Sequence, residues 1–482
     1  MNGARRIVQV SKGIKILATI GPASISPEVV REMIRNGVSG FRINMAFGNP
    51  ETWSSYVKNI REASVELDTV VSIIADIPGP QVRTGEFQVI EVKKGDIVYL
   101  TRAEQDKQSG EVVEIPVHPE QVFDVLEPGD TILYGDGEVE LSVLEVSNDR
   151  ARCLVKNHGV LKPGKKIVIL GKELPTGFLS DRDVELVKYS CSENLSYIAL
   201  SYVRSELDVQ FVRDLLTQFN CDVGIISKIE TPSGVRNAGR IADLSDAILI
   251  ARGDLGVHFP IEDIPLLQEQ ITRISVEKNK PVIVATDILD SMIENNRPSR
   301  SDVVGLYNIV HSLADAILLT NETAIGKYPV EAVKWARIIA DTAYKNTPPV
   351  LIEQSRKTIK PTTLLEKYVQ GLVYLAESLD GVILVYTKTG RTPPLISKLR
   401  PRTRVYVGSW NRKLLEKYTI YYGVNTVDLS SKLTEQDDYE KGVEELYVKT
   451  RDQGYLKPGD VVIKSYAKRG VNVHEIRVEV VI

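Results

Sequence analysis

The chain has 482 residues, of which 43% are hydrophobic and 26% are charged. At roughly 100 to 200 residues per domain, this length predicts about three domains, or fewer if one of them is a large barrel. The formal net charge of −4 gives no long-range field that would attract a polyanion, so we expect neither nucleic acid nor a membrane surface as a partner.

The start of the chain and its cysteines favour a cytoplasmic protein. The stretch MNGARRIVQVSKGIK lacks the apolar core of a signal peptide, and no apolar run approaches the ~20 residues of a membrane span. Cys153, Cys191 and Cys221 are too few and too scattered for a disulfide framework or a thiolate metal site. We therefore expect three small buried hydrophobic residues in a reducing compartment.

Eight apolar, β-branched runs recur along the chain, and helical patterns such as PEVVREMIRNG separate them. Continuously apolar strands that alternate with helices predict a closed parallel (β/α)₈ TIM barrel, in which both faces of every strand are covered. An open doubly wound sheet is the alternative, which the missing G-x-G-x-x-G after the first run disfavours. The runs are 14–22, 40–47, 72–80, 197–203, 222–230, 247–254, 281–289 and 316–323.

Two further units interrupt and follow this pattern. About 115 residues separate the third and fourth runs, and there short alternating strands with turn signals predict a small β-barrel lid inserted at the top face. After NTPP a new α/β pattern begins, with a helix near LLEKYVQGLVYLAE, a helix NRKLLEKY and strands VILVYT, RVYVGS, GDVVIKSY and EIRVEVVI. We expect the barrel at 1–85 and 176–346, the inserted β domain at 86–175 and a C-terminal α/β domain at 347–482.

Charged and polar residues collect where the predicted strands end, which in such a barrel is the mouth that holds catalytic groups. Lys228 and Glu230 lie two residues apart and therefore share one face of the fifth strand. A single residue of this kind is more often a salt bridge or a helix cap, but convergence on one barrel face predicts a functional site. The other members are Arg42, Asn44, Asp76, Arg83, Arg252, Asp254 and Thr286.

The chemistry of this set favours phosphoryl transfer, in which positioning and charge neutralisation do most of the work. Glu230 and Asp254 supply two carboxylates, which with water suit Mg²⁺, or Mn²⁺ in its place. Arg42, Arg83 and Lys228 form an anion pocket suited to phosphate. The turn in IARGDLG adds backbone N–H groups that can receive a carboxylate.

One motif comes close to a P-loop without meeting its requirements. GVLKPGKK at 159–166 has the spacing, but Lys166 replaces the Ser or Thr that binds Mg²⁺, and no strand-then-helix pattern surrounds it. We expect Lys165 or Lys166 to reach over the barrel mouth instead. The five histidines show no metal-ligand spacing.

The chain resembles the pyruvate kinase family over nearly its whole length. The resemblance implies transfer of a phosphoryl group from phosphoenolpyruvate to ADP, protonation of the enolate to pyruvate, release of ATP, and a homotetramer. The stretches that carry it are KILATIGPAS, FRIN, DIPGPQVRTG, ALSYVRS, IISKIE, ARGDLG, VATDILDSMI followed by RPSRSD, and NETAIGKYPVEAV.

The same resemblance implies a role for each residue at the mouth. Arg42 would contact the substrate phosphate, Lys228 would stabilise the migrating phosphoryl group and the enolate, and Thr286 would lie beside the methylene carbon. Backbone at Gly253 and Asp254 would receive the carboxylate. Mg²⁺ would be held by Glu230 and Asp254, and the nucleotide would be served by Asn44, Arg83 and Lys166.

Two stretches depart from the family pattern. Asn-Met-Ala-Phe-Gly at 44–48 replaces the common Asn-Phe-Ser-His-Gly, and Asp-Ile-Pro-Gly-Pro-Gln at 76–81 replaces Asp-Thr-Lys-Gly-Pro-Glu. The hydroxyl lost at Ala46 and the negative charge lost at Gln81 weaken a monovalent-cation site, of which Asn44 and Asp76 remain as ligands. We therefore expect that potassium is not required.

Two other functions stay open. A non-catalytic ligand sensor on this scaffold is disfavoured because Arg42, Lys228, Glu230, Asp254 and Thr286 are all intact. Another Mg²⁺-dependent barrel enzyme, acting on pyruvate or phosphoenolpyruvate by carbon–carbon chemistry, is disfavoured by the β insertion, since a lid suits a phosphoryl transfer that must exclude water.

In the C-terminal domain, VYTKTGRTPP at 385–394 matches in position a loop that binds phosphorylated allosteric effectors in some relatives. A surface turn is the plainer interpretation of this stretch. The residues that would hold a phosphate are Thr387, Thr389, Gly390 and Arg391.

Overall fold

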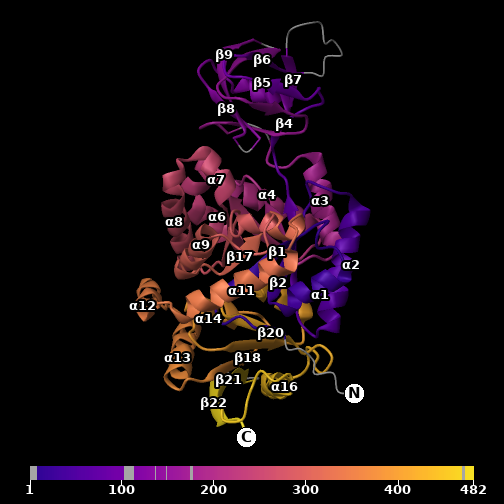
Figure 1. The fold of residues 1–482 in the computed structure, drawn as a ribbon. Coiled ribbons are helices and arrows are strands. Elements are labelled where there is room, and N and C mark those ends of the chain that lie inside the picture. Colours follow the sequence, from indigo (N-terminus) through magenta and orange to yellow (C-terminus); the bar gives the residue numbers. More distant parts are fainter. Residues whose placement is uncertain (1–7, 103–112, 136, 148, 174–176, 469–472) are drawn as a thin grey trace.

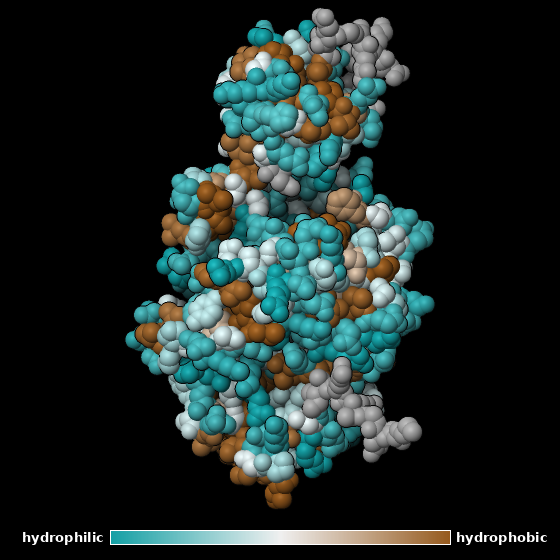
Figure 2. All heavy atoms as spheres, in the orientation of Figure 1, coloured by the Kyte–Doolittle hydropathy of each residue, from teal (hydrophilic) through white to brown (hydrophobic). Residues whose placement is uncertain are grey.

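The computed structural model describes residues 8–102, 113–135, 137–147, 149–173, 177–468 and 473–482. Three parts follow one another along the long axis of the molecule in Figure 1: a β lid at the top, a barrel in the middle and an α/β domain at the bottom. On the face seen in Figure 2 the molecule narrows between the lid and the barrel. No described helix combines the length and the apolar character that crossing a bilayer requires.

The middle part is a closed barrel of parallel strands in the order β1, β17, β16, β15, β14, β13, β3, β2. Each strand lies within or overlaps one of the predicted runs, so the (β/α)₈ prediction is confirmed and the open-sheet alternative is wrong. The strands are β1 (Lys15–Ile20), β2 (Val38–Asn44), β3 (Ser72–Ile77), β13 (Tyr197–Leu200), β14 (Gly224–Ile229), β15 (Ala247–Ala251), β16 (Val282–Ala285) and β17 (Ala316–Leu319).

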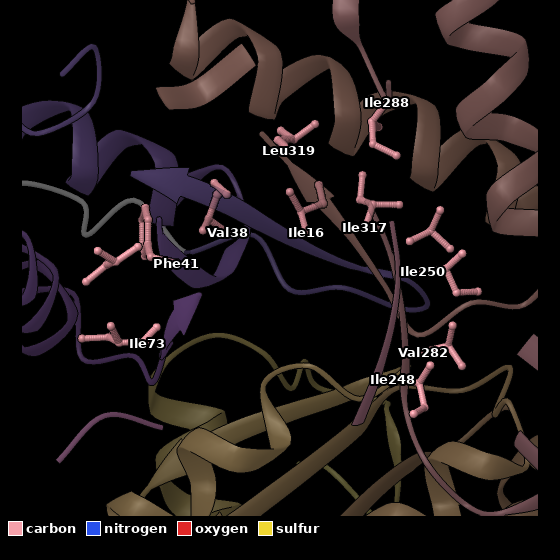
Figure 3. Packing of buried hydrophobic residues seen from close by; sticks show 14 of the residues in the cluster. Ile16, Val38, Phe41, Ile73, Ile248, Ile250, Val282, Ile288, Ile317 and Leu319 are labelled. Atoms are coloured by element: carbon pink, nitrogen blue, oxygen red, sulfur yellow. The ribbon is translucent and has the colours of Figure 1, made fainter. Parts of the chain in front are cut away.

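Helices surround this barrel, and apolar side chains fill the layer between helices and strands. Ile16, Ile317 and Leu319 from neighbouring strands lie together in this layer, as Figure 3 shows. Serine caps begin several helices, as where Ser26 accepts a hydrogen bond from Val29 N at the start of α1. The surrounding helices are α1 (Pro27–Arg35), α2 (Pro50–Glu66), α3 (Asp181–Ser192), α4 (Glu206–Gln218), α6 (Ala238–Leu244), α8 (Ile264–Glu277), α9 (Arg300–His311) and α11 (Pro329–Lys345).

Three further short helices start directly after barrel strands or close to them, on the side of the barrel that faces the lid. They are α5 (Pro232–Arg236), α7 (Arg252–His258) and α10 (Asn321–Ala324). Because each follows the carboxyl end of a strand, their first residues stand at the barrel mouth.

The lid is a second closed barrel, in the order β10, β6, β7, β4, β12, β8, β9, with a core of its own that includes Cys153. The pair β5 (Ile90–Val92) and β11 (Gly159–Leu161) lies outside that barrel. Because β4 belongs to the lid, we propose residue 82 rather than 86 as the start of the inserted domain. The barrel strands are β4 (Val82–Thr84), β6 (Ile97–Thr101), β7 (Val113–His118), β8 (Thr131–Tyr134), β9 (Val139–Val146), β10 (Arg150–Val155) and β12 (Lys166–Ile169).

The C-terminal part is a sheet in the order β20, β19, β18, β21, β22 with helices packed against it. The predicted strands and both predicted helices are present, whereas β20, α12, α14 and α16 are not predicted from the sequence. The strands are β18 (Val382–Tyr386), β19 (Val405–Ser409), β20 (Val424–Asp428), β21 (Val461–Lys468) and β22 (Val473–Val480), and the helices are α12 (Pro349–Thr358), α13 (Leu364–Ser378), α14 (Thr392–Lys398), α15 (Arg412–Tyr418) and α16 (Tyr439–Asp452).

A buried ion pair joins this domain to the barrel. Arg400 Nη1 and Nη2 donate to the two carboxylate oxygens of Asp315 at 2.8 and 2.7 Å, and Tyr422 N donates to the same carboxylate at 3.0 Å. Because Asp315 directly precedes β17, the sheet docks against the end of the barrel opposite the mouth.

The cysteine prediction is correct for one residue and wrong for two. Cys153 is a free, buried thiol, as expected. Cys191 and Cys221 form a disulfide with a Cα–Cα distance of 5.6 Å. The bond joins the end of α3 to the segment before β14, two places that lie far apart in sequence and meet only in the folded barrel. It also removes the cysteine argument for a reducing compartment.

Candidate active site

The strand-end residues converge at the barrel mouth because the closed barrel aligns the carboxyl ends of its strands. Asn44 pairs with Asp76 in the β2–β3 register, and Lys228 pairs with Leu249 in the β14–β15 register. Asp76, Lys228 and Glu230 are buried there, with Glu230 fully enclosed, while Arg42, Asn44 and Asp254 are half-buried. The geometry that follows therefore describes one compact polar cluster.

Lys228 lies at the centre of this cluster. Its Nζ is 2.9 Å from Glu230 Oε1 and 3.4 Å from Asp76 Oδ1, and it donates to Ser201 Oγ at 2.8 Å. Burial lowers the pKa of Lys228, but Asp76, Glu230 and Asp254 outweigh it, so the pKa is raised above its ordinary value and the ammonium stays charged.

Asp76 bridges two cations. Its Oδ2 accepts a hydrogen bond from Arg42 Nε at 2.6 Å, and Arg42 Nη1 donates to Thr19 Oγ1 at 3.2 Å. Burial alone would raise the pKa of Asp76, but Arg42 and Lys228 hold it below its usual value. Asp76 thus fixes both cations in place at the mouth.

Glu230 and Asp254 lie close enough for each carboxyl group to shift the pKa of the other. Glu230 Oε2 accepts from Tyr202 N at 2.8 Å, while Oε1 receives no hydrogen bond and has Lys228 as its ionic neighbour. Burial raises the pKa of Glu230, whereas Lys166 and Lys228 overcome burial and lower that of Asp254. Two carboxylates that lie close together repel each other, and a cation between them removes that repulsion.

This pair of carboxylates fits a hard divalent cation. Oxygen donors are what Mg²⁺ and Mn²⁺ prefer, and the buried Glu230 Oε1 receives no hydrogen bond. Within the described residues, no group of three or more His, Cys, Asp or Glu gathers to hold a metal. A cation here would therefore rest on two side chains and complete its shell with water and substrate.

The turn after β15 meets the turn after β16. Ala251 pairs with Ala285, so Gly253 and Thr286 come together, and Gly253 N donates to Thr286 Oγ1 at 2.7 Å. The Gly253 amide predicted to receive a carboxylate is therefore engaged by a hydroxyl that a ligand would have to displace.

The two predicted lid residues are neighbours that point differently. Arg83 and Lys166 are paired across β4 and β12. Lys166 forms an ion pair with Asp254 Oδ1 and lies 5.2 Å from the centroid of the Tyr202 ring. Arg83 instead donates to Gln81 Oε1 at 3.0 Å from Nε and to Gly164 O at 2.8 Å, and thus stays on the lid.

Lys165 does not share the position of Lys166. Its Nζ lies 3.0 Å from Glu138 Oε1 within the lid. Of the two lysines in GVLKPGKK, Lys166 is therefore the one that reaches the barrel mouth. Between lid and barrel lies a pocket lined by, among others, Gln81, Lys166, Tyr202, Arg204, Thr231 and His258.

Asn44 is turned toward its own loop rather than into the cluster. Its Oδ1 accepts from Ala46 N at 3.2 Å. Phe47, three residues on, has 69% of its surface exposed. Asn44 is thus beside the mouth, at the edge where Phe47 is open to a ligand.

The loop of the C-terminal domain that was predicted to bind an effector lies between β18 and α14. Gly390, with φ of 75°, donates its N–H to Thr387 Oγ1 at 2.9 Å, and its carbonyl accepts from the Tyr418 hydroxyl at 2.8 Å. Thr389 and Arg391 are exposed. In Figure 1 this domain is at the end of the molecule opposite the lid, so the loop forms a separate place from the mouth.

Sequence reasoning missed two residues of the cluster, Ser201 and Tyr202. Both directly follow β13: Ser201 contacts Lys228 in β14, and Tyr202 contacts Glu230, the residue directly after β14. Their position at the end of the predicted strand in ALSYVRS is the signal in the sequence that identifies them.

Fold and cluster together define a barrel enzyme in which an inserted β lid covers a site with a lysine, paired carboxylates and arginines. The family model for the pyruvate kinase barrel domain matches residues 11–333, and that for the pyruvate kinase alpha/beta domain matches residues 366–473. The chain belongs to the pyruvate kinase family and is a phosphotransferase.

Individual relatives agree with this family over the full length. The chain is 36% identical to the pyruvate kinase of Aeropyrum pernix, over 96% of this chain and 98% of that protein. It is 32% identical to the pyruvate kinase of Pyrobaculum aerophilum over 99% of each chain. The pyruvate kinase of Thermotoga maritima is also 32% identical, over 94% of this chain and 95% of that protein.

Proposed function

We propose that this chain is an active pyruvate kinase of glycolysis, which transfers the phosphoryl group of phosphoenolpyruvate to ADP and yields pyruvate and ATP. The observation that carries the proposal is the Lys228 ammonium, held between Glu230 and Asp76 beside the Glu230–Asp254 pair. A fixed cation next to a place for a divalent ion is what a migrating phosphoryl group requires.

In this assignment Arg42 binds the substrate phosphate, and Lys228 neutralises charge on the phosphoryl group and then on the enolate. Glu230 and Asp254 hold Mg²⁺ or Mn²⁺, which when bound adds positive charge against the phosphoryl and carboxylate oxygens. Thr286 stands at the methylene carbon. Because Arg42 is fixed by Asp76, its guanidinium is preorganised before substrate enters.

The backbone and the lid supply the remaining contacts. The substrate carboxylate takes the backbone N–H groups of Gly253 and Asp254, and in doing so it displaces the Thr286 hydroxyl from Gly253 N. The nucleotide is assigned to Asn44, Arg83 and Lys166. Lys166 spans lid and barrel, so its contact with Asp254 supports a lid that closes the site against water.

We also infer that potassium is not required. The Asp76 carboxylate is already taken up by Arg42 and Lys228, and the neutral Gln81 is bound to Arg83. Little negative charge is therefore left to hold a monovalent cation at the predicted weak site of Asn44 and Asp76.

We further propose that the protein is a homotetramer, that it is cytoplasmic, and that its C-terminal domain carries an allosteric phosphate site. Two hydrogen bonds support the proposed phosphate site, because Thr387 and Tyr418 hold the backbone of Gly390 in a fixed conformation. The phosphate contacts would come from Thr387, Thr389, Gly390 and Arg391.

One assay tests the proposed function. The full chain, freed of metal with a chelator, is given phosphoenolpyruvate with and without ADP and Mg²⁺, and both pyruvate and ATP are measured. We expect equal amounts of the two products only when ADP and Mg²⁺ are both present. Binding of phosphoenolpyruvate without product would instead identify a ligand sensor, and consumption indifferent to ADP would identify carbon–carbon chemistry.

A further inference from the structure

The loop that follows β16 begins in an unusual backbone conformation. Thr286 and Asp287 have φ of 68° and 52°. This left-handed region is rare for any residue other than glycine, and a β-branched threonine is a clear outlier there. Such conformations persist only where the surroundings enforce them, and they gather at functional sites. The contacts around this turn therefore identify what enforces it.

Arg252 forms hydrogen bonds to the beginning of the turn. Since Ala251 pairs with Ala285 across β15 and β16, Arg252 and Thr286 follow side by side. Arg252 Nε donates to Thr286 O at 3.2 Å, and Nη2 donates to the same oxygen and, at 2.8 Å, to Asp287 O. A planar guanidinium can span two successive carbonyl groups, whereas a lysine ammonium is a single point of charge.

Glu322 accepts a hydrogen bond from the other end of the same loop. Its side chain is buried, Oε1 accepts from Leu289 N at 3.0 Å, and Oε2 accepts from Thr320 N at 2.6 Å. The loop after β16 is thus held by charged side chains that follow the two flanking strands, β15 and β17. Arg252 is the one that acts at the two left-handed residues.

The fixed backbone in turn fixes the Thr286 side chain. Its Oγ1 donates to Ala285 O at 2.6 Å and accepts from Gly253 N at 2.7 Å. Both contacts depend on the left-handed φ, because rotation of the backbone would swing the β-carbon away from Gly253. Arg252 therefore controls where this hydroxyl stands.

We propose that Arg252 is a positioning residue whose guanidinium holds Thr286 and Asp287 in the left-handed conformation and so places the Thr286 hydroxyl at the barrel mouth. The proposal rests on the proposed function, in which Thr286 lies beside the carbon that takes up a proton. Loss of Arg252 then impairs proton transfer at that carbon more than phosphoryl transfer, because Arg42, Lys228 and Glu230 keep their own contacts.

Two readouts on the full-length enzyme separate these steps. ATP formed from phosphoenolpyruvate and ADP reports phosphoryl transfer. Exchange of pyruvate methyl hydrogens in D₂O, followed by proton NMR with Mg²⁺ and ATP present, reports proton transfer: a C–H bond breaks, its proton leaves to solvent, and a deuteron forms the new C–D bond. For Arg252→Met we expect exchange to fall at least 100-fold and ATP formation less than tenfold.

A second change tests whether backbone strain is the cause. Glycine adopts a positive φ without penalty, so adding Asp287→Gly to Arg252→Met is expected to restore exchange at least tenfold, with Asp287→Gly alone as the control. A loss of packing around Arg252 would not be repaired in this way. Equal loss in both readouts, or no recovery with glycine, overturns the proposal.

Thermal unfolding followed by circular dichroism shows whether Arg252→Met folds. If it does not fold, Arg252→Lys is used in its place. Lysine retains the charge but cannot span both carbonyls, so the same selective loss of exchange is expected, and unchanged exchange overturns the proposal. The wild-type enzyme tests the proposed function separately. Absence of ATP in the wild type refutes that function, whereas ATP formation together with unselective loss in the variants refutes the role of Arg252 alone.

Discussion

The ammonium group of Lys228 lies 2.9 Å from Oε1 of Glu230, a residue two places further along the chain. Side chains two apart on a strand point to one face, and here that face is the barrel mouth. The pair is buried, so each charge stabilises the other, and the nearby Asp76 and Asp254 are paired with Arg42 and Lys166. Removing one member therefore tests the whole cluster.

For Lys228→Met we expect ATP formation to fall by about 10³-fold, the loss typical of removing one preorganised charge from a transition state. The methionine also leaves Asp76 and Glu230 buried with one cation fewer, so thermal unfolding must be measured alongside. Lys228→Arg keeps the charge, and the exposed Lys58→Met serves as a matched control. A folded Lys228→Met enzyme that retains a tenth of its activity would contradict the assigned role.

The second prediction concerns potassium. We expect turnover in buffer free of sodium and potassium to change less than twofold when KCl is added, compared with tetramethylammonium chloride at equal ionic strength. The reason is that Ala46 and Gln81 provide neither a hydroxyl nor a negative charge. The double variant Ala46→Ser, Gln81→Glu restores both groups and should gain a dependence on potassium. A strong rise of wild-type turnover with KCl would refute the inference.

The third prediction concerns pH and the interface between barrel and C-terminal domain. Burial, followed by the charge of Arg337, lowers the pKa of Lys15 from 10.5 to about 7, and Lys15 Nζ donates a hydrogen bond to the neutral Asn425 Oδ1 at 3.3 Å. The unfolded chain therefore binds one more proton than the folded one between about pH 7 and 10.5. Stability should rise with pH across that window and be penalised below it.

Between pH 7 and 9 this linkage amounts to about 2 kcal/mol. Denaturant unfolding of Lys15→Met at both pH values is expected to lack that gain, while the exposed Lys12→Met follows the wild type. Equal pH slopes for wild type and Lys15→Met would show that Lys15 does not titrate in this window.

The eight barrel strands could be predicted because each is a short, continuously apolar run. β20 could not, because its sequence Val-Asn-Thr-Val-Asp is largely polar, and the partners of the buried Asn425 include Ser11 and Lys15, which are far away in the chain. α16 contains Gly442, which weakens a helical pattern. A side chain at Gly442 would collide with the Tyr386 ring, a reason that periodicity does not reveal.

The site likewise contains residues that the sequence predicts and residues that it does not. Charged residues at strand ends were found from spacing alone, since a barrel fixes where such ends meet. Ser201 and Tyr202 could be placed only once β13 and β14 were known to be neighbours in the closed barrel. The choice of Lys166 over Lys165 required their partners, which are Asp254 in the barrel and Glu138 in the lid. Contacts between distant segments are what a single sequence leaves undetermined.

The Cys191–Cys221 disulfide is such a contact, and it leads to the last prediction. The bond closes a segment with a sequence separation of 30. By restricting the unfolded chain, a loop of this length contributes about 3 to 4 kcal/mol to the free energy of unfolding in the chain-entropy description.

The double variant Cys191→Ser, Cys221→Ser should therefore unfold at a lower temperature than the wild type, and a thiol reductant should lower only the wild-type unfolding midpoint. Because both cysteines lie on the outside of the barrel, away from Lys228 and Glu230, ATP formation at moderate temperature is expected to stay within twofold. If reductant leaves the wild-type midpoint unchanged and thiol titration detects three free cysteines, the bond does not form in solution and the cysteines behave as the sequence alone predicts.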